Sequence, residues 1–349
     1  MKKPCTGIAV LILFVPLVLL TLAGCSKETQ IVLNVYNWGD YIDESILDDF
    51  EKQSGIKINY ETFATNEDMY IKVKQGGTKY DVIVPSDYMI EKLIKEDLLA
   101  KIDVEKIQTY KYIDSRFLGL RFDPANQYAV PYIWGTFGIL YNRTKVSDPV
   151  ESWDILWNPK YAKQILMMDS VRDSLAVAFL RLGYSLNTTD TAQLTEAAEL
   201  LIQQKPLVLA YVGDNYKDMM VQEEAALSMC WSGDAVFVRE QNADLEYVIP
   251  KEGTNLWLDC MVIPKSSEHQ EEALRFIDFM NQPEIAQRNI EYLGYATLNT
   301  AVFDLLDTQT REDPALYPPG EVSSRWEVFA DIGDANVAYN RIWTEIKSR

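Results

Sequence analysis

Hydrophobic and polar positions follow two periods along the chain after residue 30. Apolar side chains recur at every second position in two short runs, at 31–36 and 56–60, and an apolar segment follows at 80–85; these predict three β-strands. Apolar residues at helical spacing follow each run, and Asn66 and Asp87 are expected to cap the second and third helices. This alternation of strands and helices predicts an α/β fold with a parallel sheet and helices on its faces.

The alternation weakens after residue 100 and resumes at 128–135, a segment punctuated by proline and glycine that we interpret as a first crossing between two lobes. The apolar segment 258–263 is interpreted as the return crossing. Further helices are expected at 153–157, 175–182, 190–204, 271–280 and 337–346, and further strands at 207–211, 226–231 and 245–249. A chain of 349 residues is long for a single core. We therefore predict one lobe from 31–133 and 259–301, and a second from 134–258 and 302–349.

The first 24 residues have the pattern of a secretory signal. Lys2 and Lys3 precede an apolar run at 8–22, and Leu22-Ala23-Gly24 forms a small-residue cleavage site. A transmembrane anchor is the alternative, but the run is shorter than the roughly 20 residues that cross a bilayer, and it contains a proline. We predict a signal peptide at 1–24, a polar leader at 25–30 and an extracytoplasmic location.

The charge balance narrows the choice of ligand. The formal net charge is −19, and loss of Lys2 and Lys3 with the signal would take it to −21. Such acidity argues against nucleic acid, which requires a basic surface, and it attracts cations. The chain has one histidine, His269, in a polar run, so no metal site and no cofactor are predicted. Cys230 and Cys260 could form a disulfide or remain two buried thiols, and both readings stay open.

Aromatic side chains and aspartates occur together at several predicted turns. The segment 36–41, Tyr-Asn-Trp-Gly-Asp-Tyr, ends the first strand, and in open α/β sheets the carboxyl ends of strands face the ligand crevice. Similar pairs occur at 230–234 and 257–259, and the turn at 294–295 adds the ring of Tyr295. Aspartates can neutralise ammonium groups while ring faces pack against methylenes and attract cations. We expect these segments to converge on one organic cation, although Asp40 and Asp234 could instead be helix caps.

Several stretches in one order resemble the spermidine/putrescine-binding proteins of bacterial polyamine ABC importers. The resemblance covers essentially all of the sequence after the signal, and it is supported by the segments 36–41, 80–86, 130–135, 249–253 and 293–295. It implies a type II periplasmic-binding fold, with two α/β lobes joined by two crossings, that closes on a polyamine and presents it to a membrane permease. The sequence Leu22-Ala23-Gly24-Cys25 resembles a lipobox, which implies acylation of Cys25 and a membrane-tethered, monomeric protein.

The resemblance assigns roles to individual residues. The aromatic box corresponds to Trp38, Tyr41, Tyr88, Trp231, Trp257 and Tyr295. Asp259 is expected to bind one amine, Ser86 to add a polar contact and Asp173 to bind the far amine. Ser170 stands where spermidine binders tend to have a second acid, and Asp234 resembles the acid of putrescine-selective proteins. Putrescine is therefore the favoured ligand, with spermidine second. Near Glu327 the sequence departs from the family pattern. Gly39 and Asp40 are also expected to contact the ligand.

Two other interpretations remain. A binding protein for a sugar, a ferric ion or a cationic vitamin would share the two-lobed pattern, but the pairing of acids with rings favours an organic cation. A glycoside hydrolase would use two carboxylates, and acid pairs are abundant here. The sequence has no Gly-x-Ser-x-Gly nucleophile motif. We therefore predict a binding protein and not an enzyme. Five further tryptophans, Trp134, Trp153, Trp157, Trp326 and Trp343, are expected to serve packing.

Overall fold

A computed structural model describes residues 30–320 and 325–348 of the chain. The predicted signal peptide and the lipidation site Cys25 lie outside the described residues. Strand β1 (Val32–Trp38) pairs in parallel with β2 (Lys57–Phe63) and with β3 (Val82–Ile83). Helices α1 (Ser45–Ser54), α2 (Asn66–Gln75) and α3 (Asp87–Lys95) follow these strands. The expected parallel α/β arrangement of this part of the chain is confirmed.

Three local predictions need correction. The third strand spans two residues, where six were expected. The caps of α2 and α3 are Thr65 and Ser86, each one residue before the predicted cap. Thr65 Oγ1 accepts the backbone N–H of Asp68 at 3.1 Å, as an N-cap hydroxyl does. The Asp87 carboxylate instead accepts N–H groups from Tyr88 at 2.7 Å and Leu258 at 3.2 Å. It therefore ties α3 to a strand far along the chain.

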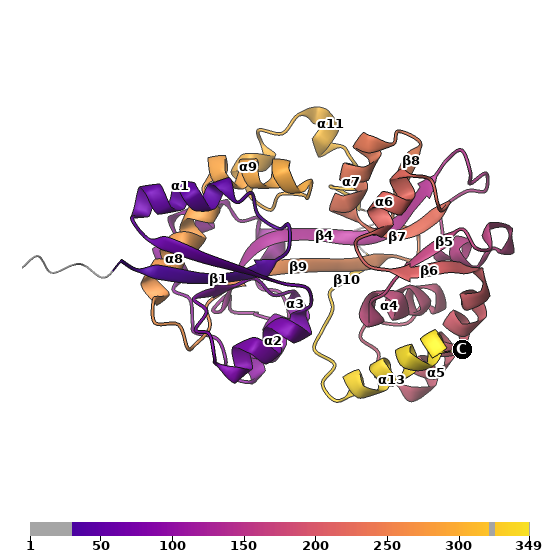
Figure 1. Cartoon of the computed structure of the whole chain (residues 1–349), viewed down its shortest axis with the longest axis horizontal. Helices are drawn as coiled ribbons and strands as arrows, with labels where there is room; N and C mark the ends of the chain where they lie inside the picture. Colours follow the sequence, from indigo (N-terminus) through magenta and orange to yellow (C-terminus); the bar gives the residue numbers. More distant parts are fainter. Residues whose placement is uncertain (1–29, 321–324, 349) are drawn as a thin grey trace, which may run out of the picture. The chain divides into compact units, whose positions relative to one another are not determined.

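Two strands run through both halves of the described chain (Figure 1). Strand β4 (Ala129–Asn142) pairs antiparallel with β9 (Thr254–Val262), and the register shifts between Pro131 and Ile133, because proline has no N–H to donate. The sheet order is β2-β1-β3-β9-β4-β7-β5-β6, with β8 beside β4 and β10 beside β9. The predicted crossings at 128–135 and 258–263 are thus the ends of two longer strands.

The remaining elements complete the two halves. The strands are β5 (Ile165–Met168), β6 (Val208–Val212), β7 (Leu227–Trp231), β8 (Leu245–Val248) and β10 (Trp326–Glu327). The helices are α4 (Val171–Leu182), α5 (Thr191–Gln204), α6 (Tyr216–Val221), α7 (Ser232–Gln241), α8 (Gln270–Met280), α9 (Pro283–Leu293), α10 (Thr300–Phe303), α11 (Thr308–Arg311) and α13 (Ala335–Ser348). The segment 153–157, expected as a helix, is a short 3₁₀ helix.

The buried apolar side chains form two large clusters and a small one. The first cluster packs α1, α3 and α8 on β1, β3 and β9, with Leu33 and Leu258 fully buried. The second packs α4, α5 and α13 on β5, β6 and β7, with Leu175 fully buried. Burial of one such side chain stabilises the fold by about 1.5–3 kcal/mol. Both clusters are therefore large enough to hold their share of the site rigidly.

Three of the five tryptophans expected in packing roles, Trp134, Trp153 and Trp343, are buried, while Trp157 and Trp326 are half-buried.

Cys230 and Cys260 are both buried free thiols, so the disulfide alternative is wrong and the alternative of two buried thiols is confirmed. Burial raises the pKa of each thiol well above its ordinary value. Within residues 30–320 and 325–348, no helix is both long and apolar enough to cross a membrane.

Candidate ligand site

Asp259 lies at the centre of the site, on β9 and beside Ser86, with which it forms an isolated antiparallel bridge. The residue is only 5% exposed, and its Oδ1 has no hydrogen-bond partner among the described residues. Burial raises the pKa of Asp259 to about 6, while the hydroxyls of Ser86 and Tyr41 act in the opposite direction. A buried carboxylate oxygen with no donor is costly in a closed protein, and a cationic ligand would satisfy it.

Three predicted rings surround this carboxylate. The centroid of Tyr295 lies 5.3 Å from the Trp257 ring and 6.1 Å from the Tyr41 ring, and both contacts are edge-on. The Tyr41 Oη and the Trp257 Nε1 are buried and, among the described residues, have no hydrogen-bond partner. Burial first, and then the charge of Asp259, raise the pKa of Tyr41 well above its ordinary value. Two unused donors therefore lie in the ring cluster around an unused acceptor.

Two glycines make room for these rings. A Cβ built on Gly135 would lie 2.4 Å from Cζ2 of Trp257, and one built on Gly233 would lie 2.4 Å from Cδ1 of Tyr295. Such distances are far below van der Waals contact, so any larger residue would push the ring away. Gly135 is on β4 opposite Trp257, and Gly233 is in the first turn of α7. The ring positions thus depend on two elements distant from them in sequence.

Asp234 lies in the first turn of α7, directly after β7 and Trp231. Its Oδ2 accepts a hydrogen bond from Tyr216, its Oδ1 accepts one from Tyr295 at 3.4 Å, and Lys217 Nζ lies 3.7 Å from the same oxygen. Burial raises the pKa of Asp234, while Lys217 and Tyr216 act against that rise. Trp231 lies edge-on to Tyr216, with ring centroids 6.3 Å apart. Tyr295 therefore contacts both Asp234 and two of the rings beside Asp259.

A second group of predicted residues forms where α3 approaches α4. Tyr88 Oη donates to Glu67 at 3.2 Å, and its ring lies 5.5 Å from the guanidinium carbon of Arg172. Ser170 caps α4 and donates to Asp173 Oδ2 at 2.6 Å. Burial raises the pKa of Asp173, whereas Ser170 and Arg172 lower it. Tyr88 packs against both large clusters, so this group also spans the two halves.

The remaining predicted contacts are less enclosed. Trp38 packs against Phe63 with ring centroids 4.5 Å apart, and its Nε1 is buried without a partner among the described residues. Gly39 and Asp40 are exposed, and Asp40 has a φ of 49°. Among the described residues, neither Gly39 nor Asp40 forms a hydrogen bond or ion pair with the buried acids. The left-handed backbone at Asp40 instead marks the turn that brings Tyr41 inward.

Sequence reasoning missed four residues that shape the site. Asp87 is fully buried, and the charge of nearby Asp259 adds to burial in raising the pKa of Asp87 well above its ordinary value. Arg172, Tyr216 and Lys217 provide charge and hydrogen bonds beside the predicted acids. Arg172 and Asp87 each adjoin a predicted residue in sequence, and this adjacency was the available signal. Tyr216 and Lys217 had no such signal, because only the packing of α6 against α7 brings them to Asp234.

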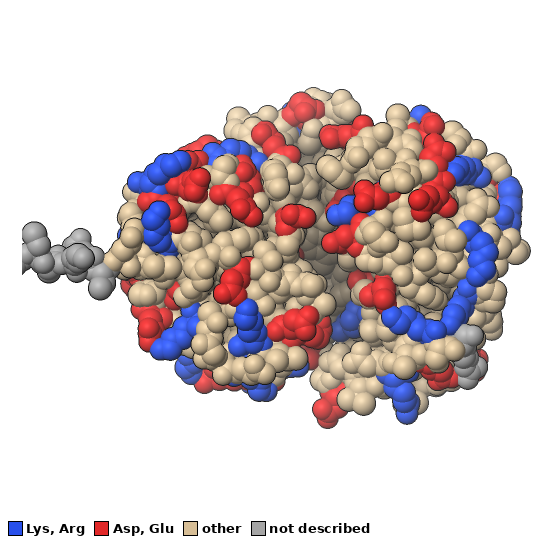
Figure 2. All heavy atoms as spheres, in the orientation of Figure 1, with Lys and Arg blue, Asp and Glu red and all other residues tan. Residues whose placement is uncertain are grey.

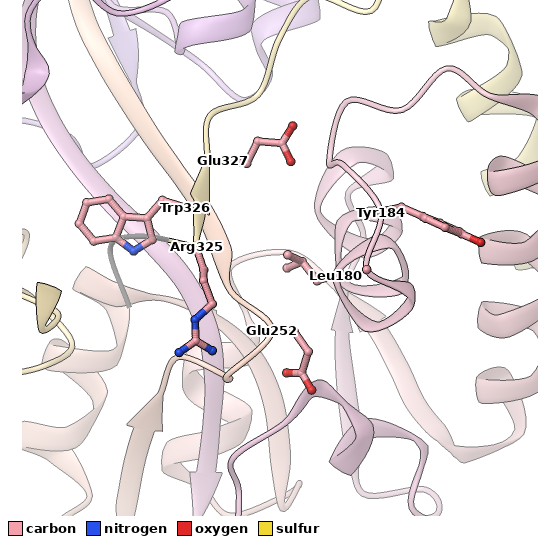
Figure 3. A pocket seen from close by; sticks show the side chains of 7 residues that line it. Leu180, Tyr184, Glu252, Arg325, Trp326 and Glu327 are labelled. Atoms are coloured by element: carbon pink, nitrogen blue, oxygen red, sulfur yellow. The ribbon is translucent and has the colours of Figure 1, made fainter. Parts of the chain in front are cut away.

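A groove lies between the two halves of the surface, and acidic side chains lie on both of its rims (Figure 2). A separate pocket of about 380 Å³ is lined by Leu180, Gly183, Tyr184, Glu252, Arg325, Trp326 and Glu327 (Figure 3). Glu327 accepts hydrogen bonds from Leu186 N at 2.8 Å and Asn187 Nδ2 at 3.0 Å. The carboxylate of Glu327 is thus engaged by the protein itself, outside the ring cluster.

The architecture defines a class: the chain has the type II periplasmic-binding fold, in which two α/β lobes share crossing strands. The chain belongs to the family of bacterial extracellular solute-binding proteins, whose model matches residues 45–318, and within it to the spermidine/putrescine-binding proteins.

Three relatives document this membership. The spermidine/putrescine-binding periplasmic protein of Salmonella typhimurium is 38% identical over 320 residues, which cover 90% of this chain and 91% of the relative. The crystal structure of the spermidine/putrescine ABC transporter substrate-binding protein PotD from Streptococcus pneumoniae is 43% identical, with a TM-score of 0.83, over 91% of this chain and 99% of that one. The TpPotD lipoprotein of Treponema pallidum is 26% identical, with a TM-score of 0.83, and the match covers 91% of this chain and 100% of that one.

Proposed function

We propose that the protein captures polyamine cations outside the cytoplasm, with putrescine favoured and spermidine as a second ligand, and delivers them to the permease of an ABC importer. One observation carries the proposal: Asp259 is buried, lacks a donor on Oδ1 and is enclosed by the rings of Tyr41, Trp257 and Tyr295. The names of the relatives in Salmonella and Streptococcus support the same ligand class.

The chemistry of a diamine fits this arrangement. A protonated diamine has two ammonium ends and an apolar middle, and burial of an unpaired ammonium is prohibitive. A charge-assisted hydrogen bond to Asp259 contributes about 1.5–3 kcal/mol, and each good ring contact adds about 0.5–2 kcal/mol. Two anchored ends and the three rings around Asp259 therefore favour a small organic cation with a charge at each end. A sugar would leave the buried carboxylate without a cation.

The second ammonium has two candidate acids. Asp234 accepts a hydrogen bond from Tyr295, one of the three rings beside Asp259, and we assign it to the second ammonium of a four-carbon diamine. Asp173 lies beside Tyr88, and we assign it to the outer ammonium of a longer polyamine. A spermidine end would find one acid there, because position 170 is a serine. These assignments explain why putrescine is the favoured ligand.

We further propose that Cys25 is acylated and tethers a monomeric protein to a bacterial membrane on its outer side. The Leu22-Ala23-Gly24-Cys25 pattern supports this, as does the lipoprotein relative in Treponema pallidum. Residues 31–133 with 259–301 would form one lobe and 134–258 with 302–349 the other, and ligand would close them about β4 and β9. No catalytic step is assigned, since the relatives are named for binding.

Isothermal titration calorimetry tests the ligand class directly. The purified chain without its signal segment is titrated with putrescine, spermidine, spermine, maltose and ferric citrate at pH 7.5. We expect saturable heat with putrescine and spermidine, and a lower Kd for putrescine. Heat with maltose or iron alone would overturn the proposal, and a clear preference for spermidine would overturn the assignment of Asp234.

A further inference from the structure

Asp234 already has a cation of the protein beside it. Lys217, the second residue of α6, places its Nζ 3.7 Å from Asp234 Oδ1. The side chains of Lys217 and Asp234 are 31% and 15% exposed, so the pair lies at the edge of the site and not on the open surface. A diamine that uses Asp234 must therefore share this carboxylate with a lysine.

The three acids of the proposed site differ in how far the protein satisfies them. Asp259 Oδ1 has no donor, and Asp173 Oδ2 has the Ser170 hydroxyl at 2.6 Å. Asp234 has two phenol donors, Tyr216 and Tyr295, in addition to the lysine. Among the described residues, it is the only one of the three acids with a lysine or arginine nitrogen within 4 Å. The protein has thus supplied Asp234 with its own ammonium.

We propose that Lys217 is a specificity-determining residue whose ε-ammonium occupies the position that the second ammonium of a diamine takes at Asp234. The ligand class affected is primary diamines and longer polyamines, and a monoamine bound at Asp259 would not meet Lys217. This inference rests on the proposed function, because it needs an amine held at Asp259.

Displacement of the lysine is physically feasible but reduces affinity. An ion pair of this exposure is weak, and the flexible four-carbon stem of lysine can turn its ammonium toward solvent. A displaced ammonium remains near the incoming cation, however, and like charges at that distance repel. Lys217 therefore weakens diamine binding and leaves monoamine binding unchanged.

The experiment compares Lys217→Met with Lys145→Met by calorimetry. Lys145 is a matched control: its Nζ lies 3.6 Å from Glu223 Oε2, outside the site, and its side chain is also 31% exposed. Each protein is titrated with putrescine and with butylamine, which has the same carbon chain and one ammonium. We expect Lys217→Met to lower the Kd for putrescine about tenfold and to change that for butylamine less than twofold. Lys145→Met should change neither Kd more than twofold.

The outcomes separate this inference from the proposed function. If the unmodified protein binds no polyamine, the proposed function fails, and the inference fails with it. If the unmodified protein binds putrescine but Lys217→Met binds it equally or more weakly, only the inference is overturned. An equal gain in affinity for putrescine and for butylamine would also overturn it. The loss of one positive charge near the site would then explain the change for any cation.

Two further variants keep the test valid if Lys217→Met is poorly folded. Lys217→Arg retains the cation and should leave the Kd for putrescine within about twofold of the unmodified value. In a double-mutant cycle, the effect of Lys217→Met on the Kd for putrescine should differ when Asp234 is already Asn, because the lysine and the diamine then no longer share a carboxylate. A tenfold loss in Lys217→Arg, or a full gain in the Asp234→Asn background, would contradict the proposed role.

Discussion

Ser86 and Asp259 face each other across an isolated antiparallel bridge that joins the segment after β3 to β9. Each residue lies where a strand meets the groove, and the bridge fixes their side chains on the same side. The Ser86 hydroxyl lowers the pKa that burial raises at Asp259, and Asn66 Nδ2 donates to that hydroxyl at 3.1 Å. The central acid is thus positioned through its bridge partner Ser86.

Replacement of the central acid should remove most of the affinity. Asp259→Asn keeps the shape of the side chain but cannot neutralise an ammonium, so we expect the Kd for putrescine to rise at least tenfold. Asp244→Asn is the control, because Asp244 is a surface acid whose loss changes the net charge equally. Calorimetry with both variants measures the difference. Unchanged binding in Asp259→Asn would exclude Asp259 as the amine contact.

The same substitution should stabilise the ligand-free protein at neutral pH. Burial raises the pKa of Asp259 from 3.8 to about 6, so the protonated form favours folding. This contribution is present below about pH 4 and is lost as pH rises through about 6. Its loss costs on the order of 3 kcal/mol. Asp259→Asn should therefore raise the Tm at pH 7.5 and change it little at pH 4, by differential scanning calorimetry. A lower Tm at both pH values would contradict this.

Ligand affinity should depend on pH through the same group. An ammonium binds the ionised carboxylate, so the affinity for putrescine should fall about tenfold per pH unit below about pH 6. Binding at pH 6 should release protons, which titrations in two buffers of different ionisation enthalpy can measure. Asp259→Asn should show little of this dependence. A flat profile between pH 5 and pH 7.5 in the unmodified protein would indicate that Asp259 is already ionised in the free state.

The position of the Tyr295 ring should be sensitive to a single methyl group added at residue 233. Gly233→Ala places a Cβ about 2.4 Å from the Tyr295 ring, so the ring must move. We expect a loss of about 1–3 kcal/mol in the free energy of unfolding and a weaker complex with putrescine. Gly213→Ala is the control, because nothing lies within 4 Å of a Cβ built there. Denaturant unfolding and calorimetry on both variants give the comparison, and equal effects would rule out the steric role.

A second acid at position 170 should shift the preference toward spermidine. Ser170→Asp retains an N-capping side chain for α4 and adds a carboxylate beside Asp173. We expect the Kd for spermidine to fall about tenfold and that for putrescine to change less than threefold. Ser170→Asn, which caps without charge, is the control. An equal effect of the two variants would place Asp173 outside the ligand's reach.

Much of the site could be predicted from sequence because its acids and rings are adjacent along the chain. Trp257 and Asp259 lie on one strand, and Trp231 and Asp234 span a strand end and the first turn of a helix. Lys217 could not be found this way, because its contact with Asp234 depends on how α6 packs against α7. The prediction that Asp87 caps α3 was wrong for a similar reason. Its carboxylate accepts a hydrogen bond from the backbone N–H of Leu258, which lies 171 residues away in sequence.

The two unpaired thiols of Cys230 and Cys260 adjoin Trp231 and Asp259, at the centre of the molecule. Both side chains are fully buried, so an alkylating reagent reaches them only when the interior opens. The rate at which such a reagent modifies them therefore reports transient opening of the interior, without any engineered label.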